Sequence, residues 1–396
     1  MTESRRPSNK AILGVILLAR ANVNLTLRIT YPFLPAISRG LGVSLGAASA
    51  LVSARSLGGV ASPLFGVLSD RLGGRRVMLL GIGLAVAGAA LTAGLPWYAV
   101  ALVGFWLMGL AKGAYDPAMQ AFVGRRVPYE QRGRALGITE LAWSATWLAM
   151  PLSGWLIANV SWRAPFVVIV AVGAMSLWLT RRTLSPDFVE PGQATGQRAG
   201  ALSALSASLA PLWRDRQAWI ALSITALLLM AADVLIIVYG AWMEDAFGLT
   251  VTALGVVSLA IGAAEAVAEL GAALLSDRLG KRRAVFMGLF FMTGGFLLLP
   301  RLTGSLAVAL AGTVLLVMAF EFSVVSFIPL VSGMSATARG TLMSLNVMAF
   351  SVGRMIAAPL AVALYRPGDL TRNGLLSAVL CLAVMGLLSL LRERGH

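Results

Sequence analysis

The sequence contains a single cysteine and a single histidine, and this scarcity removes several kinds of chemistry. Cys381 lies in the last apolar run, so the chain has no internal disulfide. His396 is the final residue and lies beyond every apolar run. A histidine-based catalytic triad and a His/Cys metal site are therefore both excluded. We expect neither a metal nor a cofactor.

Motifs for nucleotide hydrolysis and for membrane hydrolases are also missing. No G-x-x-x-x-G-K-[ST] sequence occurs, which excludes ATP-driven transport by this chain alone. Asp116 and Asp233 lie in separate apolar runs, and each stands without the second aspartate that a paired-aspartate site requires. We therefore expect the chain not to be an enzyme.

Charged residues make up only 12% of the chain, compared with about 25% in soluble domains. Hydrophobic residues make up 58%, and the mean hydropathy is +0.83. A chain of 396 residues accommodates about twelve transmembrane helices of about 20 residues each, joined by short turns. We predict an all-α membrane protein. Its predicted spans are 11–37, 45–68, 77–94, 98–122, 135–158, 164–180, 217–242, 251–275, 284–300, 305–331, 338–364 and 373–391.

The net charge of +15 would suggest a nucleic-acid partner in a soluble protein, but the positions of the basic residues indicate a membrane protein. Lys and Arg form short clusters between alternate apolar runs. If the N-terminus is cytoplasmic, the inner segments hold roughly four times as many Lys and Arg residues as the outer loops. We therefore expect a multi-pass protein of a bacterial cytoplasmic membrane, with both termini in the cytoplasm and no nucleic-acid partner.

The sequence contains an internal repeat. The segment GVLSDRLGGRR at 66–76 returns as ALLSDRLGKRR at 273–283. A polar stretch rich in Gly, Pro, Gln and Ser separates the two copies and is typical of a flexible linker. Duplicated halves place a substrate cavity at their interface near the middle of the membrane. The predicted units are a six-helix bundle at 1–180, a cytoplasmic linker at 181–216 and a second six-helix bundle at 217–396.

The repeated segment resembles the signature loop between helices 2 and 3 of the major facilitator superfamily. This resemblance implies a secondary transporter of two pseudo-symmetric six-helix bundles that works by alternating access. It implies that Asp70 faces the helix beginning near Arg339 and so holds the bundles together. Asp277 would make the mirrored contact near Arg132. The positions that carry the motif are Gly66, Asp70, Arg71, Gly73, Arg75, Asp277, Arg278 and Gly280.

Two other segments resemble the drug:proton antiporter branch of that superfamily. One is TYPFLPAISRGLGVS at 30–44, and the other is MPLSGWL at 150–156, which keeps Pro151 and Gly154 of the antiporter pattern. The resemblance implies a monomer that exports a small amphipathic organic molecule in exchange for protons. An anionic or zwitterionic solute, or a lysophospholipid, is the alternative substrate, suggested by Arg28 and Arg55. A membrane protein that does not transport is a third possibility.

Ionisable residues inside the predicted spans are the candidates for a site. A charge at the bilayer centre costs at least about 2.5–3.5 kcal/mol, so most of these side chains should face a cavity or one another. A carboxylate buried beside an arginine can change its protonation as substrate or water arrives. We expect Asp233, Glu265 or Glu321 to carry the proton, with Glu265 as the first choice. The predicted cavity residues are Asn24, Arg28, Tyr31, Arg55, Asp233, Glu265, Glu321 and Arg354.

Three further ionisable residues are secondary candidates. Lys112 and Asp116 stand four positions apart on one predicted helix, so they can neutralise each other. Glu140 lies near the cytoplasmic end of its span, where a hydrogen-bonding role is as consistent with its position as a cavity role. Arg20 is expected to extend along the helix to a membrane surface.

Overall fold

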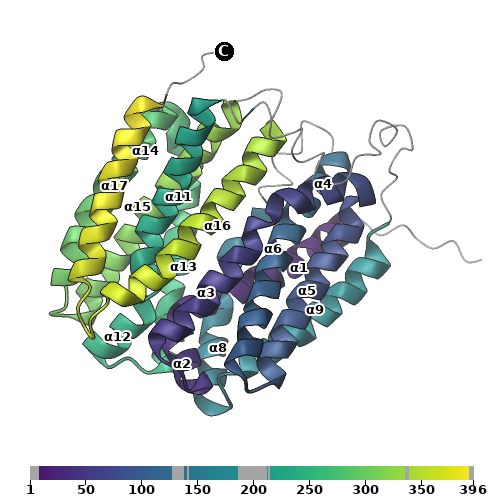
Figure 1. Cartoon of the computed structure of the whole chain (residues 1–396), viewed down its shortest axis with the longest axis horizontal. Helices are drawn as coiled ribbons and strands as arrows, with labels where there is room; N and C mark the ends of the chain where they lie inside the picture. Colours follow the sequence, from purple (N-terminus) through teal and green to yellow (C-terminus); the bar gives the residue numbers. More distant parts are fainter. Residues whose placement is uncertain are drawn as a thin grey trace, which may run out of the picture.

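The structure is a computed structural model that describes residues 9–126, 138–140, 142–185, 212, 215–334 and 339–391. It is almost entirely helical (Figure 1). The first half contains α1 (Asn9–Arg28), α2 (Thr30–Leu41), α3 (Leu45–Val60), α4 (Ser62–Leu72), α5 (Gly74–Gly94), α6 (Tyr98–Arg126), the 3₁₀ helix η1 (Ala145–Ala149), α8 (Met150–Asn159) and α9 (Ala164–Thr183). The second half contains α11 (Arg216–Ile236), α12 (Tyr239–Phe247), α13 (Val251–Leu279), α14 (Lys281–Leu298), the 3₁₀ helix η2 (Leu299–Arg301), α15 (Leu306–Gly333), α16 (Arg339–Leu364) and α17 (Thr371–Leu390).

Twelve helical segments among the described residues are long and apolar enough to cross a membrane. Their outward surface is apolar, with Leu148 74% exposed and Phe290 69% exposed. Such side chains are stable in lipid and costly in water. The predicted all-α membrane fold with about twelve spans is therefore confirmed.

Two spans break where a proline lies four positions further on. Proline lacks an N–H group, and its ring clashes with the carbonyl four residues before it. Pro32 accordingly acts on Arg28, and α1 ends at that residue. Pro151 acts on Trp147, and the chain there forms the 3₁₀ helix η1 before α8 continues the span. These two breaks position side chains of the site described below.

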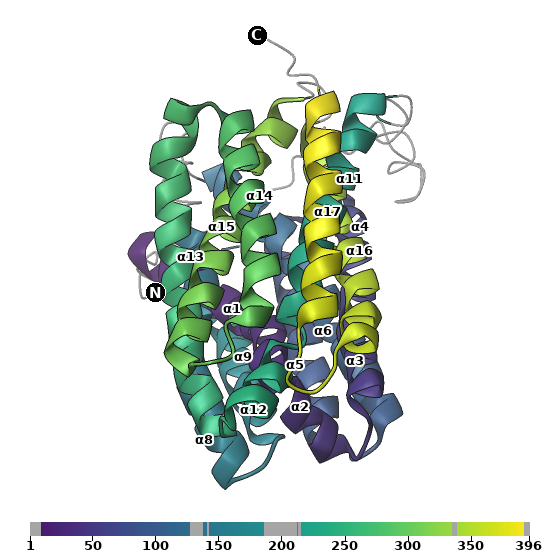
Figure 2. The same ribbon diagram turned by 90° about the vertical axis from the view of Figure 1, so that its left-hand side faces the viewer.

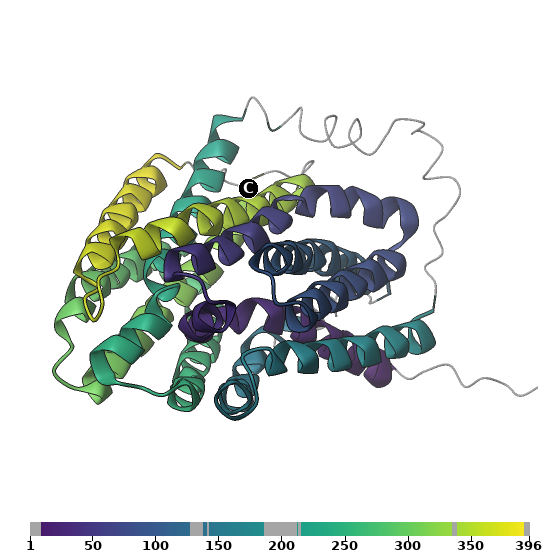
Figure 3. The same ribbon diagram turned by 60° about the horizontal axis from the view of Figure 1, so that its bottom comes forward.

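The two halves lie side by side, with purple to blue helices on one side and teal to yellow helices on the other (Figures 1 and 3). Helix α3 packs on α16, and α8 packs on α13, so each half contributes to both seams between them. Ser53 of α3 donates a hydrogen bond of 2.9 Å to the backbone oxygen of Met355 in α16. In lipid there is no hydrophobic driving force for apolar helix faces to associate. Close packing and hydrogen bonds of this kind therefore stabilise the seams.

The halves repeat in backbone detail as well as in sequence. Gly42 and Gly248 end equivalent helices with φ of 66° and 63°. Ser44 and Thr250 then cap the next helices, each accepting a hydrogen bond from the backbone N–H three residues on, at 3.2 and 3.3 Å. Positive φ of this kind strains any residue with a Cβ, which explains the glycine in both copies.

One end of the molecule is closed by contacts between the halves. We call it the closed end; α2, α8 and α12 lie there, at the bottom of Figure 2. Arg39 forms two hydrogen bonds to Glu244 at 2.7 and 3.0 Å. These bonds raise the pKa of Arg39 above its ordinary value. Above them, a Cβ on Gly240 of α12 would overlap the carbonyl of Pro32 in α2, so the two backbones touch.

The opposite end, where α9 ends and α11 begins, is called the linker end. The motif glycines lie here: Gly73 and Gly280 end α4 and α13 with φ of 86° and 83°, and both turn directly into the next helix. The predicted linker at 181–216 and the chain termini fall largely outside the described residues.

Candidate functional site

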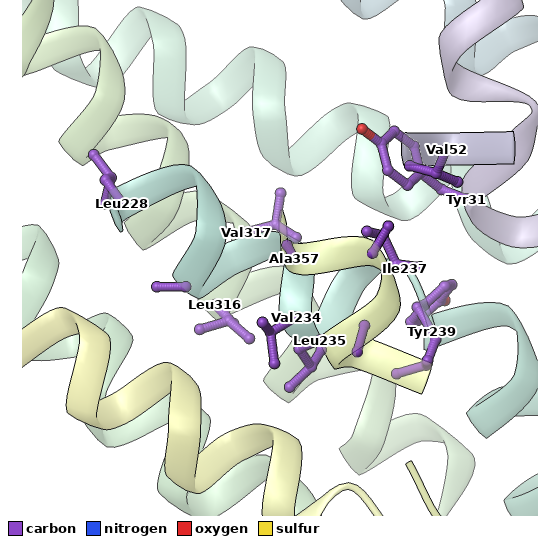
Figure 4. Close-up of a cluster of buried hydrophobic side chains, with 14 of the residues drawn as sticks. Tyr31, Val52, Leu228, Val234, Leu235, Ile237, Tyr239, Leu316, Val317 and Ala357 are labelled. Atoms are coloured by element: carbon purple, nitrogen blue, oxygen red, sulfur yellow. The ribbon is translucent and has the colours of Figure 1, made fainter. Parts of the chain in front are cut away.

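A cavity of about 540 Å³ lies between the two halves. Helices α1, α2, α3 and α6 line one side, and α11, α13, α15 and α16 line the other. Its apolar lining includes Leu235, Leu316 and Val317, which Figure 4 labels together with Tyr31 and Tyr239. From there the lining reaches Gln120 and Glu269, toward the linker end. The cavity thus combines apolar walls with a row of ionisable groups.

Arg28 and Glu265 form an ion pair that joins the halves inside this cavity. Both Nη atoms of Arg28 donate to the carboxylate, with Nη1 to Oε1 at 2.8 Å. The side chains are 6% and 4% exposed, so the pair is withdrawn from solvent. Removing one member of a buried pair typically costs about 3–5 kcal/mol because the other charge stays buried. The predicted proximity of Glu265 to an arginine is therefore present, and Arg28 is its partner.

Two tryptophans of the fifth span surround this pair. The guanidinium carbon of Arg28 lies 3.9 Å from the ring centroid of Trp143 and 4.6 Å from that of Trp147. The indole Nε1 of Trp147 donates a 2.8 Å hydrogen bond to Glu265. Cation–π contacts of this kind contribute about 0.5–2 kcal/mol each. The sequence analysis did not identify these tryptophans; their signal is the spacing of four positions, which puts both on one helix face.

Arg354 and Asp233 form a second ion pair, within the second half. The Nε atom of Arg354 on α16 lies 2.6 Å from Oδ2 of Asp233 on α11. The side chains are 17% and 3% exposed. The guanidinium carbon of Arg354 lies 5.6 Å from the centroid of the Tyr31 ring. Both were predicted cavity residues, and both line the cavity.

Arg55 enters the cavity from α3, where it is 1% exposed. Its Nη1 donates to the backbone oxygen of Leu27 at 2.9 Å and to the hydroxyl of Thr30 at 2.7 Å. These acceptors flank the break between α1 and α2. Its guanidinium carbon lies 5.7 Å from the centroid of Tyr31. A Cβ on Gly109 of α6 would overlap the Arg55 carbonyl, so this part of α3 lies directly against α6.

Glu321 lines the cavity from α15 and is 8% exposed. It makes no ion pair and no side-chain hydrogen bond with any other described residue, unlike Glu265 and Asp233. Glu265 and Arg28 are within electrostatic range of it. Glu321 is thus the cavity carboxylate whose charge has the weakest local compensation among these three.

A second polar cluster lies in the first half, on the linker side of Arg28. Lys112 Nζ lies 2.6 Å from Asp116 and 2.7 Å from the side-chain oxygen of Asn24. The predicted pairing of Lys112 with Asp116 is confirmed. Arg20 joins the cluster, 2.9 Å from Glu140 and 3.5 Å from Asp116. The prediction that Arg20 extends to a surface is wrong: it is 4% exposed, because two carboxylates hold it inside.

The signature-loop residues lie away from the cavity. The side chains of Asp70 and Asp277 fall outside the described residues, so their predicted contacts with the facing helices do too. Arg75 donates a 2.9 Å hydrogen bond to the backbone oxygen of Arg181 at the end of α9. Gly66 and Arg71 belong to α4, and Arg278 is exposed near the end of α13.

The family model of the Major Facilitator Superfamily matches residues 16–358 and, in a second match, 221–396. The chain belongs to this superfamily. The D-xylose-proton symporter has the same fold, with a TM-score of 0.76 and 16% identity over 97% of this chain and 98% of that one. A bacterial homologue of the human lysosomal transporter Spinster, solved in an inward-facing and unoccupied conformation, gives a TM-score of 0.75 and 14% identity over 99% and 98%.

Among curated superfamily members, the MFS-type transporter YceJ of Bacillus subtilis is 24% identical over 85% of this chain and 84% of its own length. The match to YcnB of the same organism, 31% identical, covers 44% of this chain but only 38% of that protein. The lysophospholipid transporter LplT of Salmonella heidelberg is 28% identical over 48% and 46%. These relatives and the fold are those of transporters and not of enzymes.

Proposed function

We propose that this transporter exports a small amphipathic organic molecule across a bacterial cytoplasmic membrane in exchange for protons. It works as a monomer, with the linker end in the cytoplasm. The amphipathic character follows from the lining, where Leu316, Val317 and Phe320 stand beside ionisable groups. The distribution of Lys and Arg along the chain supports the orientation.

The proton-coupled part of the proposal rests on one observation, which is that Glu321 is buried without an ion-pair partner among the described residues. Asp233 and Glu265 each hold a buried arginine, so protonating either one leaves a buried cation without its partner. Glu321 has no such partner among the described residues, and a carboxylate buried in this way accepts a proton readily. We therefore place the exchangeable proton on Glu321. We assign a second role to Glu265, whose ion pair with Arg28 responds electrostatically to the charge of Glu321.

Alternating access requires that the cavity, which extends toward the linker end, also open through the closed end. For this opening, the ion pair between Arg39 and Glu244 must break and α2 must move away from α12. The Arg28–Glu265 ion pair is connected to that movement, because Arg28 ends α1 and only the break at Ile29 separates α1 from α2.

The test uses purified protein in liposomes that contain the pH dye pyranine. Tetraphenylphosphonium, ethidium, 2-naphthoate and lysophosphatidylethanolamine are added outside in turn. An exchanger makes the interior more alkaline as a molecule enters and protons leave. Glu321→Gln should abolish this signal yet keep exchange of labelled against unlabelled molecule. Asp369→Asn, in the loop before α17, is the matched carboxylate control and should behave as the unmodified protein.

Two results would contradict this proposal. If Glu321→Gln moves protons as fast as the unmodified protein, the proton is carried elsewhere. If molecules cross with no proton movement, the chain is a uniporter.

Lysophospholipid transport is the second candidate function. The match to the LplT lysophospholipid transporter over 48% of this chain favours it, as does a cavity lined by four arginines among apolar residues. The same assay separates the two candidates, because only the lysophosphatidylethanolamine arm should then give a saturable signal.

A further inference from the structure

Arg55 is a buried guanidinium with hydrogen-bonding capacity to spare. Its Nη1 binds the break between α1 and α2, as described above. Its Nε and Nη2 are also buried and make no hydrogen bond of good geometry among the described residues, although the Tyr31 hydroxyl lies close enough to interact with the guanidinium. A role in holding that break therefore uses only one of its three nitrogens. The other two are available on a side chain that lines the cavity.

The charges around Tyr31 do not balance. The guanidinium carbons of Arg55 and Arg354 lie 5.7 and 5.6 Å from the centroid of its ring, and the one carboxylate that pairs with either of them among the described residues is Asp233. Glu321 acts on Arg354 electrostatically but forms no ion pair with it. The Tyr31 hydroxyl is affected electrostatically by both arginines but has no hydrogen-bond partner of good geometry. An excess positive charge in a dry site is unfavourable until an anion neutralises it.

We propose that the transported molecule carries an anionic group, and that this group binds between Arg55 and Tyr31. Nε and Nη2 of Arg55 form the planar fork that suits a carboxylate, sulfonate or phosphate. The Tyr31 hydroxyl donates a third hydrogen bond, and Arg354 adds its field. The inference rests on the proposed function, because it names the charge of the molecule accepted by the same cavity.

The surroundings of this subsite specify the rest of the molecule. Tyr239, Phe320 and Val317 line the same cavity and offer apolar contacts. Figure 4 shows Tyr31 and Tyr239, from α2 and α12, with the Tyr31 hydroxyl directed away from Val52. Both Nη atoms of Arg28 are already bonded to Glu265, and only its buried Nε lacks an acceptor, so Arg28 does not offer an anion the two-nitrogen fork that Arg55 does. The substrate class is an amphipathic organic anion of a size that about 540 Å³ can hold.

The test compares ligands that share one apolar body and differ in charge. Binding of 2-naphthoate, 2-naphthylmethanol and 2-naphthylmethyl-trimethylammonium to the purified protein is measured by calorimetry, without a proton gradient. We expect the anion to bind at least tenfold more tightly than the other two. Lysophosphatidylglycerol is added as a competitor, to tell whether a lipid anion occupies the same subsite.

Variants locate the effect on Arg55. Arg55→Gln should remove the preference for the anion while leaving the affinity for 2-naphthylmethanol within about twofold, and Arg55→Lys should restore part of the preference. Tyr31→Phe should weaken anion binding only. Arg301→Gln, at an exposed position at the end of η2, is the control and should change nothing.

Equal affinities for the three ligands in the unmodified protein would overturn the inference, and this result does not depend on whether the Arg55 variants fold. It would leave the proposed proton exchange standing. Conversely, anion binding that depends on Arg55 without any proton movement in liposomes would support the subsite and refute proton coupling.

Discussion

Arg28 shows how single residues create this site from distant parts of the chain. Pro32 ends α1 at Arg28, and the guanidinium then reaches a carboxylate 237 positions away in the sequence. Trp143 and Trp147 enclose it from a third segment. Neither charge is solvated by water while the halves are together. Each charge is therefore stabilised mainly by the other.

This dependence can be measured as a coupling energy. Arg28→Gln and Glu265→Gln should each lower the stability in detergent by about 3–5 kcal/mol, because each leaves a buried charge unpaired. The double variant should lose less than the sum, with a coupling energy of about 1–3 kcal/mol. Cys381 is fully buried and is the chain's sole cysteine, so a thiol-reactive dye reports unfolding directly. If the stability losses of the two single variants add up to that of the double variant, the interaction between Arg28 and Glu265 contributes no coupling energy.

At the scale of elements, the distance between neighbouring helices determines where the charged side chains of the cavity lie. Arg55 is held in register because α3 touches α6 at Gly109, where no Cβ is tolerated. Glycines also control helix geometry at the linker end. The positive φ of Gly73 and Gly280 lets α4 and α13 turn directly into the next helix.

The contact at Gly109 predicts a difference between two otherwise identical substitutions. Gly109→Ala pushes α3 away from α6 and should lower stability by about 1–3 kcal/mol. Gly83→Ala on α5 meets nothing within 4 Å and should be neutral or slightly stabilising, because alanine favours helix by up to about 1 kcal/mol. Thermal unfolding of the two variants measures the difference. Anion binding should also weaken in Gly109→Ala alone, and equal stability of the variants would contradict the close contact.

At the scale of the whole molecule, the two halves make a closed end and a cavity that reaches the other end. The closed end depends on few polar contacts. Arg39 is 59% exposed, and an exposed ion pair contributes only about 0.2–1 kcal/mol. Tyr365 donates a 2.6 Å hydrogen bond to Asp245 close to the same end, but both residues belong to the second half. Weak contacts at this end are consistent with the opening that the proposed alternating access requires.

Reversing one charge at the closed end should shift the balance between the two states. Arg39→Glu places two carboxylates together and should raise labelling of a Ser351→Cys probe, introduced with Cys381→Ser, by about fivefold when an impermeant thiol reagent is added on that side. Ser351 lines the cavity. The exchange Arg39→Glu with Glu244→Arg should restore the original rate. If the exchanged pair labels as fast as Arg39→Glu, the ion pair does not hold this end.

Much of the architecture could be predicted from the sequence alone. Apolar run length is a local property, and the bilayer converts it directly into spans. The glycines of the repeated segments were predictable for the same reason, since their positive φ is a local requirement. The expectation that intramembrane charges face a cavity followed from the cost of leaving them in lipid.

Partner choice among those charges was decided only by the tertiary structure. The sequence offered several arginines to Glu265, and helix packing selected Arg28, gave Asp233 to Arg354 and left Glu321 and Arg55 without ion pairs among the described residues. Arg20 was placed wrongly because its carboxylates, Asp116 and Glu140, lie on other helices. Ion pairing depends on separations of a few ångströms between segments that lie far apart in the sequence, and no property of a single span encodes these separations.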